Sequence, residues 1–192
     1  IPTTATGIRT RIPNRPLQPG PVEEVWPASG PVERIEIEGA TAAADGRSMF
    51  VAMEARACSD QDLDARAYAL YRRLLRSLPR SGYPNVVRIW NYVPDIHGKA
   101  SGIDRYMLFC KGRADAFAEA HGGEFANRLP AASAVGCPGD TLVVHALASR
   151  DPVRHVENPR QVSAYRYPER YGPKSPSFAR GTVALGGLQG AL

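Results

Sequence analysis

Arginine and aromatic side chains recur together in this sequence, and they are the residues best suited to do chemistry in it. They gather at 88–92, 104–106, 112–113 and 165–171, and a further arginine stands at Arg180. A guanidinium group pairs with a carboxylate through two parallel hydrogen bonds, and tyrosine hydroxyls add further donors. For any single residue, packing or a surface ion pair is the simpler interpretation. Together, the clusters could hold a small substrate with more than one carboxylate.

Other catalytic residue types occur without a recognised spacing. The cysteines are Cys58, Cys110 and Cys137, and the histidines are His97, His121, His145 and His155. No CxxC pair, HExxH, GxSxG, P-loop or GxGxxG after a strand is present, so we predict no metal site and no nucleotide site. No cysteine has the basic neighbour that would make it a nucleophile. Reduced, widely spaced thiols favour a cytoplasmic protein.

The net charge of +5 leaves several interpretations open, because three of the 24 basic residues are lysines and the rest are scattered arginines. Nucleic-acid binding is one, although no basic run supports it. Neutral arginine enrichment from a GC-rich genome is a second, and a small multiply anionic substrate is a third. The longest apolar run, near 141–149, is far shorter than the ~20 residues of a membrane helix, so we expect no membrane span.

The elements that must position the arginines follow from periodicity. Residues 1–31 are rich in proline and predict an extended arm. Alternation over 32–38 predicts a strand, and a turn at 45–47 followed by a strand over 48–53 suggests a hairpin with it. A helix should follow, with Ser59 as N-cap and Asp62 completing a capping box, ended by Pro79 and Gly82.

The second half of the chain shows the same mixture of elements. The pattern predicts a strand over 85–93, a helix over 103–120 and a second hairpin formed by 131–135 and 141–148. A last strand is expected over 161–167. Arg105 and Arg113 are eight residues apart, close to two helical turns, so both can point to the same side. The order of elements indicates an α+β fold with helices on one face of a sheet.

Four blocks in this order carry a specific resemblance. They read GYP…R.WNY.P.I at 82–96, DRY..F..GR..AF at 104–117, LPA.SAVG at 129–136, and NPRQ.SAY…YGP.SP.F.R at 158–180. This set is similar to the signature of chorismatases, enzymes that remove pyruvate from chorismate to give a hydroxybenzoate or a dihydroxycyclohexadiene carboxylate. The first 50 residues contribute little to the resemblance.

The resemblance implies a two-part enzyme built from two YjgF-like (chorismate-mutase-like) domains. On this basis we expect an arm over 1–31, a YjgF-like domain over 32–165, and over 166–192 a linker with the start of a second such domain. The catalytic Glu is expected beyond Leu192. The resemblance further implies chorismate as substrate, no cofactor or metal, and a monomer with two pseudo-repeat domains. The substrate-binding residues would be Tyr171, Arg180, Arg105 and Arg113.

The alternative function is that of a YjgF-like imine deaminase or small-ligand-binding module. Such proteins consist of one short domain, and the blocks at 82–96 and 104–117 are not theirs. Nucleic-acid binding has only the charge of the chain in its favour.

Overall fold

The computed structural model describes residues 7–17, 19–20, 22–28, 30–56, 62–100 and 102–185. Its principal strands are β1 (Glu33–Ile37), β2 (Ala40–Ala44), β3 (Ser48–Ala55), β4 (Asn85–Pro94), β7 (Ala131–Cys137), β8 (Leu142–Ser149), β9 (Val153–Val156) and β10 (Gly181–Ala184). Two-residue strands β5 (Lys99–Ala100) and β6 (Ile103–Asp104) pair with each other. The helices are α1 (Leu63–Arg80) and α2 (Arg105–His121), and 3-10 turns lie at η1 (Gly122–Arg128), η2 (Ala164–Arg166) and η3 (Glu169–Tyr171).

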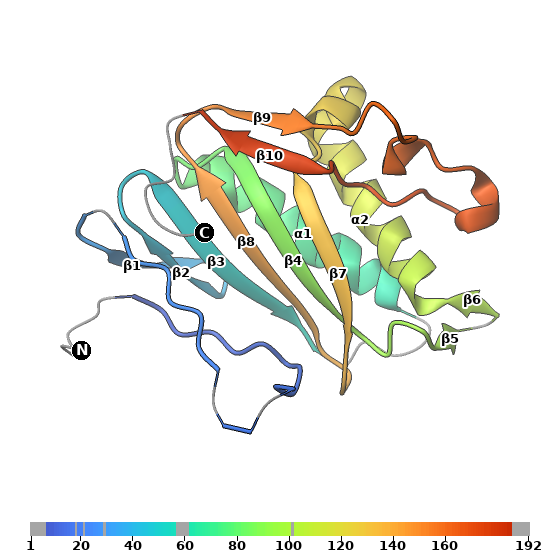
Figure 1. The fold of residues 1–192 in the computed structure, drawn as a ribbon, viewed down its shortest axis with the longest axis horizontal. Helices are drawn as coiled ribbons and strands as arrows, with labels where there is room; N and C mark the ends of the chain where they lie inside the picture. The colour runs from blue at the N-terminus through green and yellow to red at the C-terminus, as the bar shows by residue number, and fades with distance from the viewer. Residues whose placement is uncertain are drawn as a thin grey trace.

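Six strands form the main sheet in the order β1-β2-β3-β8-β4-β7, and both long helices cover one of its faces (Figure 1). The predicted α+β class and the one-sided placement of the helices are therefore confirmed. Alternate residues of each strand face the helices, as Met49 and Val51 of β3 and Ile89 of β4 show, and these side chains are almost fully buried. Against them packs the apolar stripe of α1, including Leu70 and Leu74.

Both predicted hairpins are wrong. Strand β2 lies between β1 and β3 and pairs antiparallel with each of them. Its sequence, ATAAA, is mostly alanine, which lacks the β-branched side chains typical of strands. In the second half, β4 lies between β7 and β8, because β7 pairs parallel with β4 and not with β8. Parallel pairing needs a crossover connection, and α2 provides it.

The first helix begins and ends differently from its prediction. Ser59 lies outside the described residues, and the N-cap position is occupied by Asp62, whose side chain makes no capping hydrogen bond. The helix continues through Pro79 and ends at Arg80. Pro79 lies in the last turn of the helix, and its missing backbone N–H removes one helical hydrogen bond. Proline therefore costs less stability there than in the middle of a helix.

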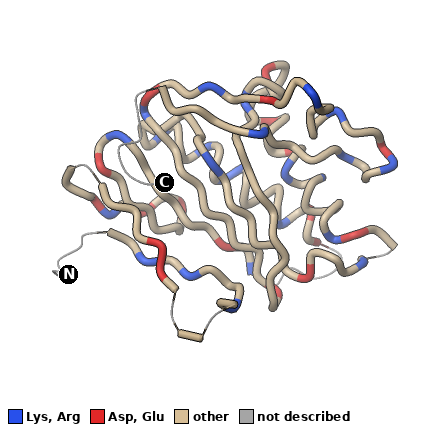
Figure 2. The backbone as a smooth tube through the Cα atoms, in the orientation of Figure 1, with Lys and Arg blue, Asp and Glu red and all other residues tan. Residues whose placement is uncertain are grey.

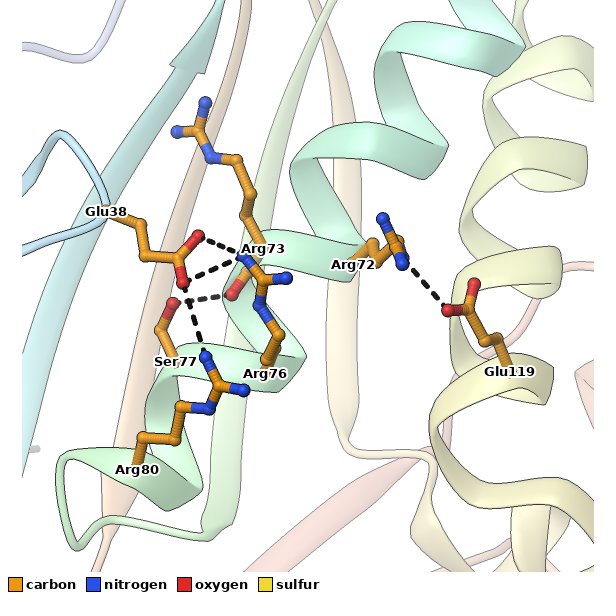
Figure 3. Close-up of polar contacts among 7 residues, drawn as sticks. All are labelled: Glu38, Arg72, Arg73, Arg76, Ser77, Arg80 and Glu119. Atoms are coloured by element: carbon orange, nitrogen blue, oxygen red, sulfur yellow. Dashed lines mark hydrogen bonds and ion pairs between the residues drawn. The ribbon is translucent and has the colours of Figure 1, made fainter.

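Close packing of α1 against α2 depends on one small residue and a set of surface ion pairs. A Cβ on Gly112 of α2 would lie 2.0 Å from the backbone oxygen of Asp64 in α1, so the helices touch there. Farther along, Arg72 of α1 binds Glu119 of α2 with Nε–Oε1 at 2.9 Å (Figure 3).

Glu38, next to β1, accepts hydrogen bonds from Arg76 of α1 and lies 3.9 Å from Arg80 (Figure 3). The hydrogen bond from Arg76 is the main cause that lowers the pKa of Glu38. These contacts are solvent-exposed, so they set the position of α1 more than they add stability.

Two segments outside the main sheet pack back onto it. In the arm, the Trp26 ring lies 5.5 Å from that of Trp90 on the sheet face opposite the helices. In the tail, β10 pairs with β9, and Ala179 forms a parallel bridge with Ala131 at the edge of the sheet. The strand predicted over 161–167 is wrong, because this stretch contains a proline-flanked 3-10 turn at η2.

Candidate functional site

A cavity of about 560 Å³ lies between α2, the edge strand β7 and the tail segment at 176–178. It is lined by Asn91, Ile96, His97, Asp104, Tyr106, Phe109, Cys110, Arg113, Ala132, Ser133, Ala134, Pro176, Ser177 and Phe178. The walls are mainly apolar and aromatic, and a few polar groups converge on the space. This combination is typical of sites for small molecules.

Arg113 is the cation of this cavity. The residue is 3 % exposed, and its Nε and Nη2 have no hydrogen-bond partner among the described residues. Its guanidinium lies over the rings of Tyr71 and Phe117, at 5.2 and 4.9 Å from their centroids. Cation–π contacts contribute about 0.5–2 kcal/mol each, whereas burial of an unpaired ion costs several kcal/mol. An anion in the cavity would supply the missing partner.

A chain of buried polar groups holds the wall next to Arg113. The Tyr71 hydroxyl donates to Oδ1 of Asn91, and Nδ2 of Asn91 donates to the carbonyl oxygen of Ser133 at 2.7 Å. Burial raises the pKa of Tyr71, so its hydroxyl remains a donor at neutral pH. The contacts tie α1 to β4 and β4 to β7.

We expect Tyr71→Phe to destabilise the fold by about 1–2 kcal/mol, because Oδ1 of Asn91 would lose its donor inside the protein. The phenyl ring would still lie under Arg113, so ligand affinity should change less than twofold. Chemical denaturation and a ligand titration on the same variant would check both parts. Unchanged stability would show that the hydroxyl contact contributes nothing.

Two titratable groups of the cavity are kept neutral. Burial raises the pKa of the Cys110 thiol to about 11, and burial likewise raises the pKa of Tyr106. A protonated thiol is a poor nucleophile, which agrees with the prediction for Cys110. These groups can donate hydrogen bonds to an anion without adding negative charge.

Arg105 does not line the cavity. Its side chain is 3 % exposed and donates from Nε to the carbonyl oxygen of Pro94 at 3.0 Å, while its backbone N–H donates to Gly98. Both contacts fix the turn that carries His97 into the cavity wall. Arg105 and Arg113 therefore lie on the same buried side of α2 with different partners.

The other two predicted residues lie at the rim. Arg180 donates from Nη2 to the Tyr167 hydroxyl at 2.8 Å, and its guanidinium lies 5.3 Å from the ring centroid of Phe178, which lines the cavity. Tyr171 is 50 % exposed, with its ring centroid 5.7 Å from that of Tyr167. The structure thus brings Arg180 to the edge of the cavity, and Tyr171 stands one ring farther out.

Sequence reasoning missed several residues of the cavity, among them Asn91, Ser133 and Ser177. Asn91 faces inward between Trp90 and Tyr92, which lie on the outer face of β4. An Asn at an inward position of an apolar strand is a usable signal of a buried polar network. Ser177 is 2 % exposed in a segment without periodicity, and only the fold brings it to α2.

The opposite face of the sheet carries a row formed by Arg88, Trp90 and Tyr92, three members of the cluster noted at 88–92. The Arg88 guanidinium lies 5.6 Å from the Trp90 ring centroid, so these two side chains share one face. His145 lies on this outer face beside Phe50 and Tyr92. None of these residues lines the cavity.

The described part of the chain shows neither of two further features. No helix in it is long and apolar enough to cross a membrane. Its His, Cys, Asp and Glu side chains also form no group of three that could hold a metal ion.

The structure is that of a mixed α+β protein with a cavity whose wall contains a buried cation. Residues 24–148 match the family described as chorismatase FkbO/Hyg5-like, N-terminal. The chain belongs to this FkbO/Hyg5-like chorismatase family.

Similar proteins agree with this assignment. The chain is 40 % identical over 164 residues to a 3-hydroxybenzoate synthase of Streptomyces hygroscopicus, covering 84 % of this chain and 47 % of that protein. It is also 40 % identical over 162 residues to a chorismatase of the same organism, covering 83 % and 46 %. A chorismatase crystal structure superposes with a TM-score of 0.72 at 36 % identity, over 79 % of this chain and 45 % of the other. The chain spans about half the length of these relatives.

Proposed function

We propose that this chain is the N-terminal part of an enzyme that removes pyruvate from chorismate, giving a hydroxybenzoate or a dihydroxycyclohexadiene carboxylate. The observation that carries the proposal is Arg113, a buried guanidinium with two unpartnered nitrogens in the wall of a cavity. Chorismate bears two carboxylates, and a buried guanidinium binds a carboxylate through charge-assisted hydrogen bonds. The names of the relatives supply the reaction class.

The reaction needs a general acid and two cationic contacts. Protonation of the enolpyruvyl methylene carbon creates a cation next to the ether oxygen, and water or the ring hydroxyl then adds to that cation before pyruvate leaves. We propose that Arg113 binds one carboxylate and that Arg180, at the rim, binds the other with Tyr171 beside it. Arg105 acts as a positioning residue through the turn at 95–98. The catalytic Glu would lie in the half of the relatives that this chain does not span.

The proposed architecture is a pair of YjgF-like units in one polypeptide, a monomer that works in the cytoplasm without a cofactor. The first unit would occupy 32–165, and residues 166–192 would lead into the second. The six-stranded sheet with helices on one face is the observation that supports a YjgF-like first unit. In the described part, the tail also contributes to this unit through β10.

Two other functions predict different ligands. A YjgF-like imine deaminase or ligand-binding module would also suit a buried Arg113, but it would bind small carboxylates without releasing pyruvate from chorismate. Nucleic-acid binding would require a continuous basic surface, whereas the Lys and Arg positions are scattered along the chain among acidic ones (Figure 2).

Pyruvate release tests the proposed function. The full-length natural protein should release one pyruvate for each chorismate consumed. A coupled lactate dehydrogenase assay follows the pyruvate. Binding of chorismate without pyruvate release would favour the ligand-binding module. No binding and no release would refute the proposal.

A further inference from the structure

A second cavity, of about 170 Å³, lies at the far end of α2 and shares no lining residue with the first. Its walls come from the ends of α1 and α2, from η1 and from β9, which runs toward the end of α2 (Figure 1). Leu75 and Leu78 form part of an apolar side. The polar side holds His121, Arg128 and His155 together.

The charges around this cavity are unbalanced. Arg128 is exposed and forms no ion pair with any carboxylate in the described part of the chain. Burial lowers the pKa of His121 and of His155, and the charge of Arg128 lowers both further. The charge of His121 also lowers the pKa of His155. The cavity therefore holds one fixed cation and two histidines whose protonation is disfavoured by burial and by the charge of Arg128.

No carboxylate is among the residues that line this cavity, although Glu157, which follows β9, has both carboxylate oxygens buried without a hydrogen-bond partner among the described residues. From η1, Glu124 accepts a hydrogen bond from Nδ2 of Asn127 at 3.2 Å. From the end of α1, Arg80 lies 3.9 Å from Glu38. From β4, the wall residue Asn85 donates to a backbone carbonyl. From β10, the contact is the uncharged hydroxyl of Thr182.

The hydrogen bonding of Thr182 also orients the His155 ring. Its Oγ1 accepts the backbone N–H of Ala131 at 2.9 Å and lies 3.1 Å from Nδ1 of His155. The hydroxyl can donate to Nδ1 or accept from it, because it has one donor and two acceptor sites. Once the ring is protonated, Nδ1 donates to Oγ1 and Nε2 is a second hydrogen-bond donor.

We propose that this second cavity binds a small oxyanion of the sulfate or phosphate type, held by Arg128 and the two histidines, with uptake of protons on binding. An anion there supplies the charge that the three groups lack. It also favours the charged imidazoles over the neutral ones, so the protonated site binds more tightly. Affinity therefore rises as the pH falls through the range in which histidine titrates, and it weakens at alkaline pH.

Calorimetric titration with sulfate tests the proposal, because sulfate keeps a constant charge over the range used. The full-length protein should bind sulfate on the order of tenfold more tightly near pH 6 than near pH 8. In two buffers of different ionisation enthalpy, the heats near pH 6 should differ in the direction of proton uptake.

Four variants make the test specific. Arg128→Gln should weaken sulfate binding on the order of tenfold, the loss of one charge-assisted contact. Arg154→Gln is the matched control, because Arg154 is an exposed neighbour of His155 on β9. This variant should bind sulfate as tightly as the unmodified protein does. His155→Asn should flatten the pH dependence, and His121→Asn serves the same purpose if the first variant does not fold.

Two results would overturn the proposal. Equal sulfate affinity in Arg128→Gln and Arg154→Gln would mean that the anion binds elsewhere or through general surface charge. Equal affinity near pH 6 and pH 8 would remove the histidines from the site. Neither result depends on chorismate turnover, so this proposal and the proposed function can fail separately.

Discussion

Gly112→Ala is expected to destabilise the protein by about 3 kcal/mol, because the added Cβ has no space between the two helices. That atom would lie 2.0 Å from the Asp64 backbone oxygen and 2.9 Å from the Tyr68 backbone nitrogen. Backbone atoms cannot rotate away, so α1 and α2 must move apart. The higher helix propensity of alanine offsets only about 1 kcal/mol of this cost. Chemical denaturation followed by circular dichroism measures the change.

Gly123→Ala is the matched control, since nothing lies within 4 Å of a Cβ at that position and its stability change should stay within about 0.5 kcal/mol. Gly112 directly precedes Arg113, so a separation of the helices should also weaken ligand binding in the first cavity. A Gly112→Ala protein as stable as the control would show that the helices approach less closely than described here.

Arg113→Met is expected to lower the affinity for chorismate-like carboxylates by roughly 10- to 100-fold without lowering stability. The first effect is the loss of charge-assisted hydrogen bonds to the ligand. The second follows because the variant replaces a buried, unpaired ion by an apolar side chain of similar length, and such exchanges are often neutral or stabilising. Ligand titration and thermal unfolding of the ligand-free protein measure the two effects separately.

A variant that retains the charge sharpens this result. Arg113→Lys should keep part of the affinity, because an ammonium group supplies the charge without the two-pronged geometry. Arg72→Met removes an exposed arginine paired with Glu119 and should leave binding unchanged. If Arg113→Met bound the ligand normally but unfolded at a lower temperature, Arg113 would be a structural residue held by Tyr71 and Phe117.

The helices and most strands could be predicted from the sequence, since their periodicity reports burial on one side. The apolar stripe that includes Leu70 and Leu74 predicted α1 in the region where it lies. The pairing of strands could not be predicted, because a strand records which of its faces is buried but not which strand lies beside it. For this reason β4 between β7 and β8, and the alanine strand β2, emerge only from the fold.

The candidate site was predictable in part for a similar reason. Arg113 was predicted as a binding residue from the family resemblance and from its spacing of eight residues from Arg105, whereas its burial on α2 emerges only from the fold. Arg105 was predicted on the same grounds, yet its partner is the backbone carbonyl of Pro94 at the end of β4. Spacing along a helix shows that two side chains share a side, but not what each meets there. Ser177 gave no signal at all, because its burial depends on the tail returning to α2.

The central claim is that the cavity next to α2 binds a carboxylate of chorismate through Arg113. A crystal structure of the full-length protein with a stable dicarboxylate analogue of chorismate tests this most directly. We predict one carboxylate of the analogue within hydrogen-bonding distance of Nε and Nη2 of Arg113, with the rest of the molecule directed toward Phe178 and Arg180. An analogue bound elsewhere, or a carboxylate side chain of the protein already paired with Arg113, would contradict it.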